Sequence, residues 1–367
     1  MTTSQDAHSL PQLGQVIAAC MEALNDGDYQ VARHLADRAQ ALARTTGPLG
    51  RANAALVTGM AEQAVGDTDT AAEKYTKAAN LTRPHLAEPD GICLYLHARM
   101  ELAALHRAEG RYHEAGHILH DALTTTAAAD PAPHDLALLH NELGVVSKYS
   151  GDFDLAAASY RAALALLESV LPGDDPELAT LHHNIGGLAH ARGDYAAAEG
   201  PARRAVEIRE KALGPDHPDT ATDKAALAPI LLGLDRLEEA EQLLHQALTV
   251  LERTRGTGHP DYAIALGNLA ATTHQLGHHQ SAEILYQRAL HLLEQALGPD
   301  HPDLAPVLTN LAELHHNLGN ADLAHTLSTR ARAILTASVR RDHPTLTALT
   351  ERTLVCPGSD GVGSLDN

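Results

Sequence analysis

The amino-acid sequence predicts an all-α solenoid of about eight helix–turn–helix repeats that ends in a capping helix. One observation is a period: Pro176, Pro218, Pro260, Pro302 and Pro344 are each 42 residues apart, and two alanine columns that begin at Ala156 and Ala163 keep the same step. The other is composition, because 44% of the residues are apolar but only 3% are aromatic, which leaves alanine and leucine to form the core. These are the strongest helix formers. A stacked array grows without one large core, so the period predicts a solenoid.

The linker and turn residues of the repeating unit predict that it contains two helices. The segments GPDHPD at 214–219 and 298–303 contain a glycine that ends one helix and a proline that fits the first position of the next. Asp216 or His217 can cap that next helix. Short turns, GDF at 151–153 and GDY at 193–195, then separate it from a second helix. This second helix carries the alanine columns on its buried face, because larger side chains would push the two helices apart.

The earlier units are less regular but still recognisable. Their turn glycines are spaced 39, 44 and 41 residues apart before the step settles at 42, and Asp235 replaces the turn glycine in the sixth unit. We expect a disordered N-terminus over 1–11 and a capping helix over 344–355, followed by a Gly/Ser/Asp-rich disordered tail over 356–367. The eight repeats of the solenoid (12–343) are expected at about 12–50, 51–90, 91–133, 134–175, 176–217, 218–259, 260–301 and 302–343.

Charge and cysteine usage exclude several functions. The formal net charge is −20, without a basic run, which argues against binding to nucleic acids or to anionic membranes. The polar N-terminus predicts no signal peptide, and no apolar run is long enough to span a membrane. Three scattered cysteines, Cys20, Cys93 and Cys356, fit a reducing cytoplasm, so we expect a cytoplasmic protein.

The turns and the linkers carry a family resemblance. The turn and pairing pattern resembles the tetratricopeptide repeat (TPR) family, and LGPDHPD at 213–219 and 297–303 resembles the 42-residue repeats of kinesin light chains and of many bacterial proteins. The resemblance implies a right-handed superhelix with a concave groove lined by the first helix of each pair. It also implies a protein or peptide bound in that groove. The alanine-rich, lysine-poor composition resembles proteins of actinobacteria, which predicts a bacterial origin.

Two columns of residues are expected to line this groove. The slot nine residues before the turn holds Glu142, Asn184, Ala226, Asn268 and Asn310. In the family this slot commonly carries an asparagine that hydrogen-bonds the backbone of a bound peptide, because an amide both donates and accepts. The alternative is an asparagine that bonds a neighbouring helix.

The second column is cationic or titratable in five of its six members. It consists of Arg107, Lys148, His190, Leu232, His274 and His316, next to Asn141 and His183. Such a stripe favours a partner with acidic or carboxylate groups, and its histidines would make binding sensitive to pH. The alternative is an ordinary polar groove that faces water.

Metal, cofactor and enzyme signatures are not expected. His217, His259, His301 and His343 recur in the turns between repeats, and no Cys–His pair is expected to meet. No phosphate loop, nucleophile elbow or HExxH motif occurs, so we expect neither an enzyme nor a cofactor. The sequence therefore predicts a protein- or peptide-binding adaptor or scaffold. The alternative is a regulator that responds to a signalling peptide and acts through a separate transcription factor or enzyme. Neither the partner nor the oligomeric state follows from the sequence.

Overall fold

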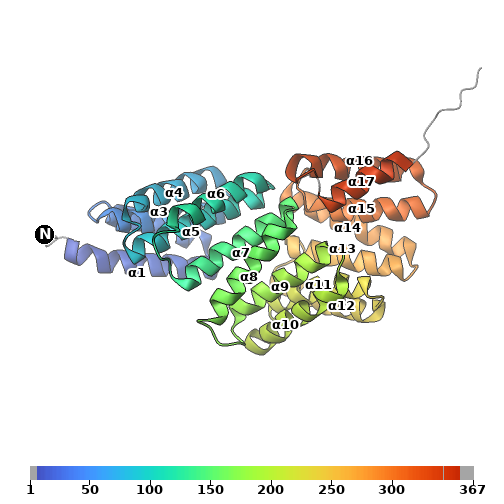
Figure 1. The fold of residues 1–367 in the computed structure, drawn as a ribbon, viewed down its shortest axis with the longest axis horizontal. Coiled ribbons are helices and arrows are strands. Elements are labelled where there is room, and N and C mark those ends of the chain that lie inside the picture. Colours follow the sequence, from blue (N-terminus) through green and yellow to red (C-terminus); the bar gives the residue numbers. More distant parts are fainter. Residues whose placement is uncertain (1–5, 342, 356–367) are drawn as a thin grey trace, which may run out of the picture. The chain divides into compact units, whose positions relative to one another are not determined.

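The structure is a computed structural model that describes residues 6–341 and 343–355. Within these residues the chain is all-helical, and sixteen helices follow one another as eight consecutive pairs before a last helix (Figure 1). The first four pairs are α1 (Asp6–Asn25) and α2 (Tyr29–Ala43), α3 (Pro48–Ala64) and α4 (Thr68–Thr82), α5 (Pro89–Ala108) and α6 (Tyr112–Thr126), and α7 (Pro133–Ser150) and α8 (Phe153–Glu168). The other four are α9 (Pro176–Ala191) and α10 (Tyr195–Leu213), α11 (Pro218–Gly233) and α12 (Leu237–Thr254), α13 (Pro260–Gln275) and α14 (His279–Leu297), and α15 (Leu304–Asn317) and α16 (Ala321–Ser338). A short 3₁₀ helix, η1 (Arg83–His85), follows α4.

The chain divides into two compact units. Unit 1 comprises the residues up to Val146 together with Arg161–Val170, and unit 2 comprises Ser147–Tyr160 together with the residues from Leu171 onward. In unit 2 the first helices contact one another in order, α9 with α11, α11 with α13 and α13 with α15. No helix in the described part of the chain is long and apolar enough to cross a membrane.

The ends of the array differ in part from the expectation. Helix α1 begins at Asp6, so residues 6–11, expected to be disordered, continue the helix that buries Leu13 and Val16. At the other end, α17 (Pro344–Val355) covers the expected capping segment and packs against α16. The predicted disorder of 1–5 and 356–367 lies outside the described residues.

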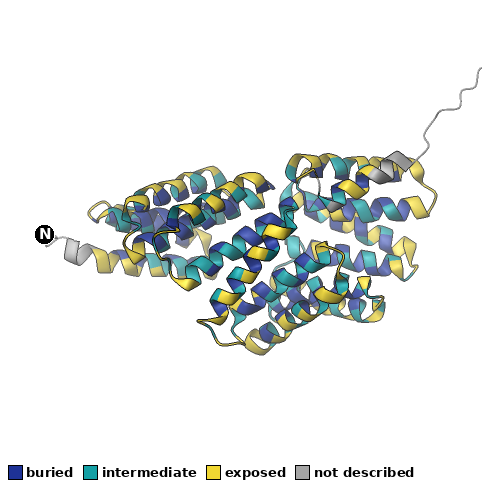
Figure 2. Cartoon of the chain, in the orientation of Figure 1, coloured by how far each residue is buried: buried dark blue, intermediate teal, exposed yellow. Residues whose placement is uncertain are grey.

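Alanine builds the interior of each helix pair. Ala156, Ala198, Ala240 and Ala282 of the first alanine column are fully buried, and the second column is fully buried from Ala163 through Ala331. Figure 2 shows the same pattern, with buried residues on the facing sides of the helices and exposed residues outside. Gly186 shows how close the pairs are, because a Cβ there would lie 3.1 Å from the backbone nitrogen of Ala202. The small residues therefore set the spacing between α9 and α10.

Histidine, not Asp216, caps α11, and the equivalent histidine caps α13. Nδ1 of His217 accepts the Asp219 N–H at 3.2 Å, and Nδ1 of His259 accepts the Asp261 N–H at the same distance. A protonated imidazole cannot accept, so these caps require the neutral ring. The turn inside each pair needs a positive φ, which Gly193 supplies at 75° and Asp235, in the sixth repeat, at 60°.

Candidate peptide-binding surface

The residues predicted to line the groove all lie on the first helices of their pairs. Arg107 ends α5, and Asn141 and Lys148 lie on α7. The others lie on α9 (His183, Asn184, His190), α13 (Asn268, His274) and α15 (Asn310, His316). Arg107 and Asn141 belong to unit 1, and the other eight belong to unit 2. In unit 2, α9, α11, α13 and α15 contact one another in order, and the side of the unit that carries the predicted columns on these helices is here called the first-helix surface.

His183 is held by a charge pair that the sequence did not reveal. Its Nδ1 lies 2.8 Å from Oδ1 of Asp223 on α11. Asp223, only 3% exposed, also accepts from Nε of Arg209 at 2.7 Å. Arg209 donates in turn to the Thr180 hydroxyl at 3.1 Å. A buried carboxylate needs such partners, and the contacts of Asp223 and Arg209 join α9, α10 and α11.

The asparagine column is only partly available to a peptide. Nδ2 of Asn268 donates to the Ala225 carbonyl oxygen of α11 at 3.1 Å. This is the contact with a neighbouring helix that the sequence left as an alternative, and it uses one of the two amide hydrogens while the side-chain oxygen can still accept. Asn184 is almost buried, at 9% exposure, whereas Asn310 is partly exposed.

The cationic column carries less positive charge than the sequence suggests. Burial lowers the pKa of His190, and the nearby Lys148 lowers it further. Burial also lowers the pKa of His274, helped by His279. Both imidazoles are therefore neutral at pH 7. In unit 1, Nε of Arg107 lies 3.5 Å from Glu142, which offsets its charge. The first-helix surface is thus mainly polar and neutral, with hydrogen-bonding imidazoles in place of a positive stripe.

Apolar side chains lie within the same surface. Ile264 on α13 is 40% exposed, and Pro306, its equivalent one repeat later on α15, is also exposed. Ile264 precedes Gly267 by three residues, and Pro306 precedes Thr309 by three. Gly267 and Thr309 occupy the same position in their repeats as His183 does in its own. An exposed isoleucine beside hydrogen-bonding groups suits an extended segment that buries alternate side chains and pairs its backbone.

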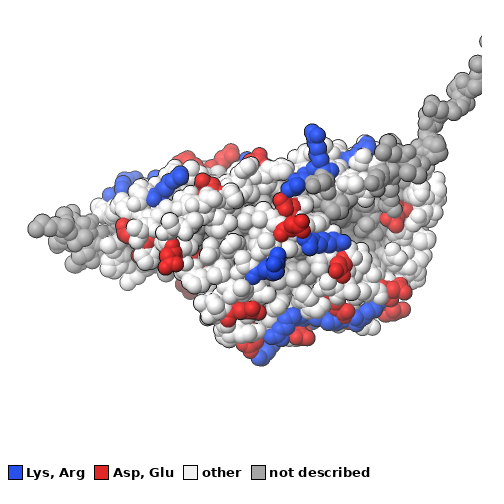
Figure 3. All heavy atoms as spheres, viewed as in Figure 1, with Lys and Arg blue, Asp and Glu red and all other residues white. Residues whose placement is uncertain are grey.

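Ion pairs stiffen the edges of unit 2. Arg255 lies 2.5 Å from Asp219 and also contacts Asp261, which links the first turns of α11 and α13. On the second helices, Arg203 pairs with Glu199 at 2.8 Å and with Glu239 at 2.7 Å. Figure 3 shows the resulting mixture of both charge signs over α10 and α12. These cations already have acidic partners, so that edge offers no uncompensated basic patch.

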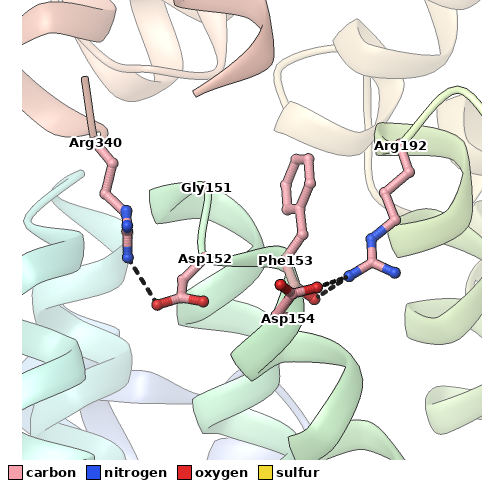
Figure 4. Close-up of a pocket in the computed structure, with 6 residues that line it drawn as sticks. All are labelled: Gly151, Asp152, Phe153, Asp154, Arg192 and Arg340. Atoms are coloured by element: carbon pink, nitrogen blue, oxygen red, sulfur yellow. Dashed lines mark hydrogen bonds and ion pairs between the residues drawn. The ribbon is translucent and has the colours of Figure 1, made fainter. Parts of the chain in front are cut away.

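A polar cavity of about 310 Å³ lies where the segment after α16 meets the turn before α8 in unit 2 (Figure 4). Nη1 of Arg340 lies 2.8 Å from Oδ2 of Asp152, and Nη2 of Arg192 lies 2.8 Å from Oδ1 of Asp154. The Arg340 N–H also donates to the Ser150 carbonyl oxygen at 2.9 Å. Each carboxylate already faces a guanidinium, so the contact ties two distant parts of unit 2 together and we assign it no ligand.

Unit 1 brings together a group that the sequence was expected to keep apart. The ligand atoms of Cys93, His97 and Asp135 all lie within 4.8 Å of one another. This corrects the expectation that no Cys–His pair meets. Cys93 and His97 lie four residues apart on one face of α5, and Asp135 comes from the first turn of α7. The spacing Cys-x₃-His at 93–97 is the signal that could have found it.

Tandem antiparallel helix pairs with alanine-packed interiors and glycine turns define a helical-repeat protein. The family model described as Tetratricopeptide repeat matches residues 134–211, 177–230, 223–295 and 282–337, which together span more than half of the chain. The chain therefore belongs to the tetratricopeptide repeat family, as its turns and linkers indicated. TPR repeats generally serve as non-catalytic scaffolds for protein interaction, and no enzyme family is indicated.

Two solved structures, with TM-scores of 0.62, show the same fold. The chain is similar to the apo form of the quorum sensor NprR from B. thuringiensis, with 14% identity, a TM-score of 0.62 and coverage of 88% of this chain and 86% of that one. It is similar to a Rap protein complexed with Competence and Sporulation Factor, with 10% identity, a TM-score of 0.62 and coverage of 94% and 97%. A putative kinesin light chain of Podosopora anserina with nearly identical TPR-like repeats shares 21% identity at a TM-score of 0.45, over 57% and 97%. A search of curated proteins found no match.

Proposed function

We propose that this chain is an adaptor or scaffold that holds an extended segment of a partner protein on the first-helix surface of unit 2. The observation that carries the proposal is the ordered row on contacting first helices, in which Asn184, Asn268 and Asn310 repeat at one register. The amide oxygens and the imidazoles offer hydrogen bonds to a peptide backbone, and Ile264 offers apolar contact.

The charge of the first-helix surface indicates which kind of peptide segment it would bind. Neutral His190 and His274 pair with either donors or acceptors, so we expect affinity to depend on backbone hydrogen bonds more than on an acidic stretch. Lys148 and His316 remain the groups through which an acidic or carboxylate-bearing partner would gain affinity.

A triple substitution tests the proposal. A peptide selected on the full chain from a random display library should bind Asn184→Ala/Asn268→Ala/Asn310→Ala about thirtyfold more weakly. Asn184 is buried, so the two accessible amides, at about 1 kcal/mol for each hydrogen bond, contribute about 2 kcal/mol, which is about thirtyfold in Kd. Calorimetric titration measures the change, and thermal melting shows whether the fold is kept.

The matched control changes three exposed amides on second helices, Gln242→Ala/Gln246→Ala/Gln280→Ala. It should leave the Kd unchanged. Equal weakening by both triple variants, or unchanged binding by the asparagine variant, would contradict the assignment of the surface. Failure to select any peptide would count against peptide binding itself.

A second candidate function is a regulator that closes on a small signalling peptide. It is favoured by the similarity in fold to a Rap protein complexed with Competence and Sporulation Factor, whose length this chain covers almost fully. Solution scattering separates the two functions. A regulator of this kind contracts when the selected peptide binds, whereas a scaffold keeps its radius of gyration.

A further inference from the structure

Cys93, His97 and Asp135 of unit 1 form a cluster that peptide binding to unit 2 does not use. All three side chains are partly buried, and their ligand atoms lie within 4.8 Å of one another. Nε2 of His97 lies 3.6 Å from Oδ1 of Asp135. We propose that this cluster is a zinc site, with Cys93, His97 and Asp135 as its three protein ligands.

The local sequence explains why the three side chains meet. Cys93 and His97 are four residues apart on α5, which places them one turn apart on the same face of the helix. Asp135 lies in the first turn of α7, whose start is set by Pro133. Two rigid helices therefore supply all three ligands, and no long loop has to be ordered.

The donor set selects zinc among common divalent cations. A thiolate, an imidazole and a carboxylate are the three ligand types that zinc binds, whereas magnesium and calcium take oxygen ligands. Two ligands about 2 Å from a tetrahedral ion are roughly 3.3 Å apart, so the 3.6 Å between His97 and Asp135 needs little adjustment. The thiolate and the carboxylate together balance the charge of the ion. The fourth position falls to water or to His134, whose Nδ1 lies 4.0 Å from Asp135.

Titration of the untagged, chelator-treated full chain with zinc tests the proposal. We expect one equivalent of zinc to bind and the melting temperature to be higher with zinc present. Cobalt in place of zinc should show the charge-transfer absorption of a thiolate-bound, tetrahedral ion. A titration without a saturable equivalent, or cobalt spectra without thiolate absorption, would overturn the site.

Substitutions distinguish the proposed zinc ligands from residues that do not bind the ion. Cys93→Ala and Asp135→Asn should each weaken zinc binding about a hundredfold, since even second-shell changes cost up to that much. Cys93→His should retain zinc but lose the thiolate band of cobalt, which a merely structural role for Cys93 does not predict. The controls are Cys20→Ala, a buried thiol elsewhere in unit 1, and His113→Gln/His117→Gln, an exposed pair four residues apart on α6. Loss of zinc in the His113/His117 variant with full binding in Cys93→Ala would place the metal elsewhere and refute the proposal.

Discussion

Asp223→Ala is expected to lower the free energy of unfolding by about 3 kcal/mol, because it removes one partner of a buried charge pair. Asp223 is 3% exposed and Arg209 is 13% exposed, and they lie 2.7 Å apart. Without the carboxylate, the mostly buried Arg209 guanidinium keeps only Asp219, 3.9 Å away, as an acidic neighbour, and His183 loses its 2.8 Å contact. Urea unfolding monitored by circular dichroism measures the change.

A control and a double variant make this expectation specific. Asp216→Ala removes a carboxylate that is 76% exposed and should change stability by less than about 0.5 kcal/mol. Asp223→Ala/Arg209→Leu removes both charges and should recover much of the loss, because no unpaired ion remains. A loss in Asp223→Ala as small as that in Asp216→Ala would show that the pair does not hold α9, α10 and α11 together.

Ala198→Leu is expected to cost a similar amount, about 3 kcal/mol, through overpacking. Ala198 is fully buried, and its carbonyl oxygen would lie 3.2 Å from a Cβ added at Gly186, so α9 and α10 have no room for three more carbon atoms. The neighbouring Ala197 on the same helix is exposed. Ala197→Leu should therefore leave the urea midpoint within the error of the wild type. Equal midpoints for the two leucine variants would contradict the account of how alanine sets the helix spacing.

The fold was predictable because the same residue types recur every 42 residues along the sequence. Pro176, Pro218 and Pro260 each begin a first helix, as the 42-residue step predicts. Ala240, Ala247 and their equivalents are buried because their small size is needed wherever two helices touch. The exception is α15, which begins at Leu304 and not at Pro302, although Nδ1 of His301 accepts the Asp303 N–H as in the other linkers.

The site was less predictable because it depends on contacts between repeats. Register places Asn268 on the first-helix surface, but only packing shows that its amide bonds Ala225 of α11. A column of histidines predicts a positively charged stripe. Burial lowers the pKa of His190, however, so its imidazole is neutral at pH 7. Asp223 belongs to neither predicted column, yet its carboxylate lies 2.8 Å from His183. A residue that occurs in only one repeat produces no periodic pattern by which the sequence could reveal it.

Amide hydrogen exchange of the full chain, with and without the display-selected peptide, tests the central claim most directly. The surface assignment predicts slower exchange in α9, α11, α13 and α15 when the peptide is bound, with α10, α12, α14 and α16 unchanged. The first helices should lose this protection in the triple asparagine variant and keep it in the triple glutamine variant. Protection confined to the second helices, or to unit 1, would contradict the claim that unit 2 holds its partner on the first helices.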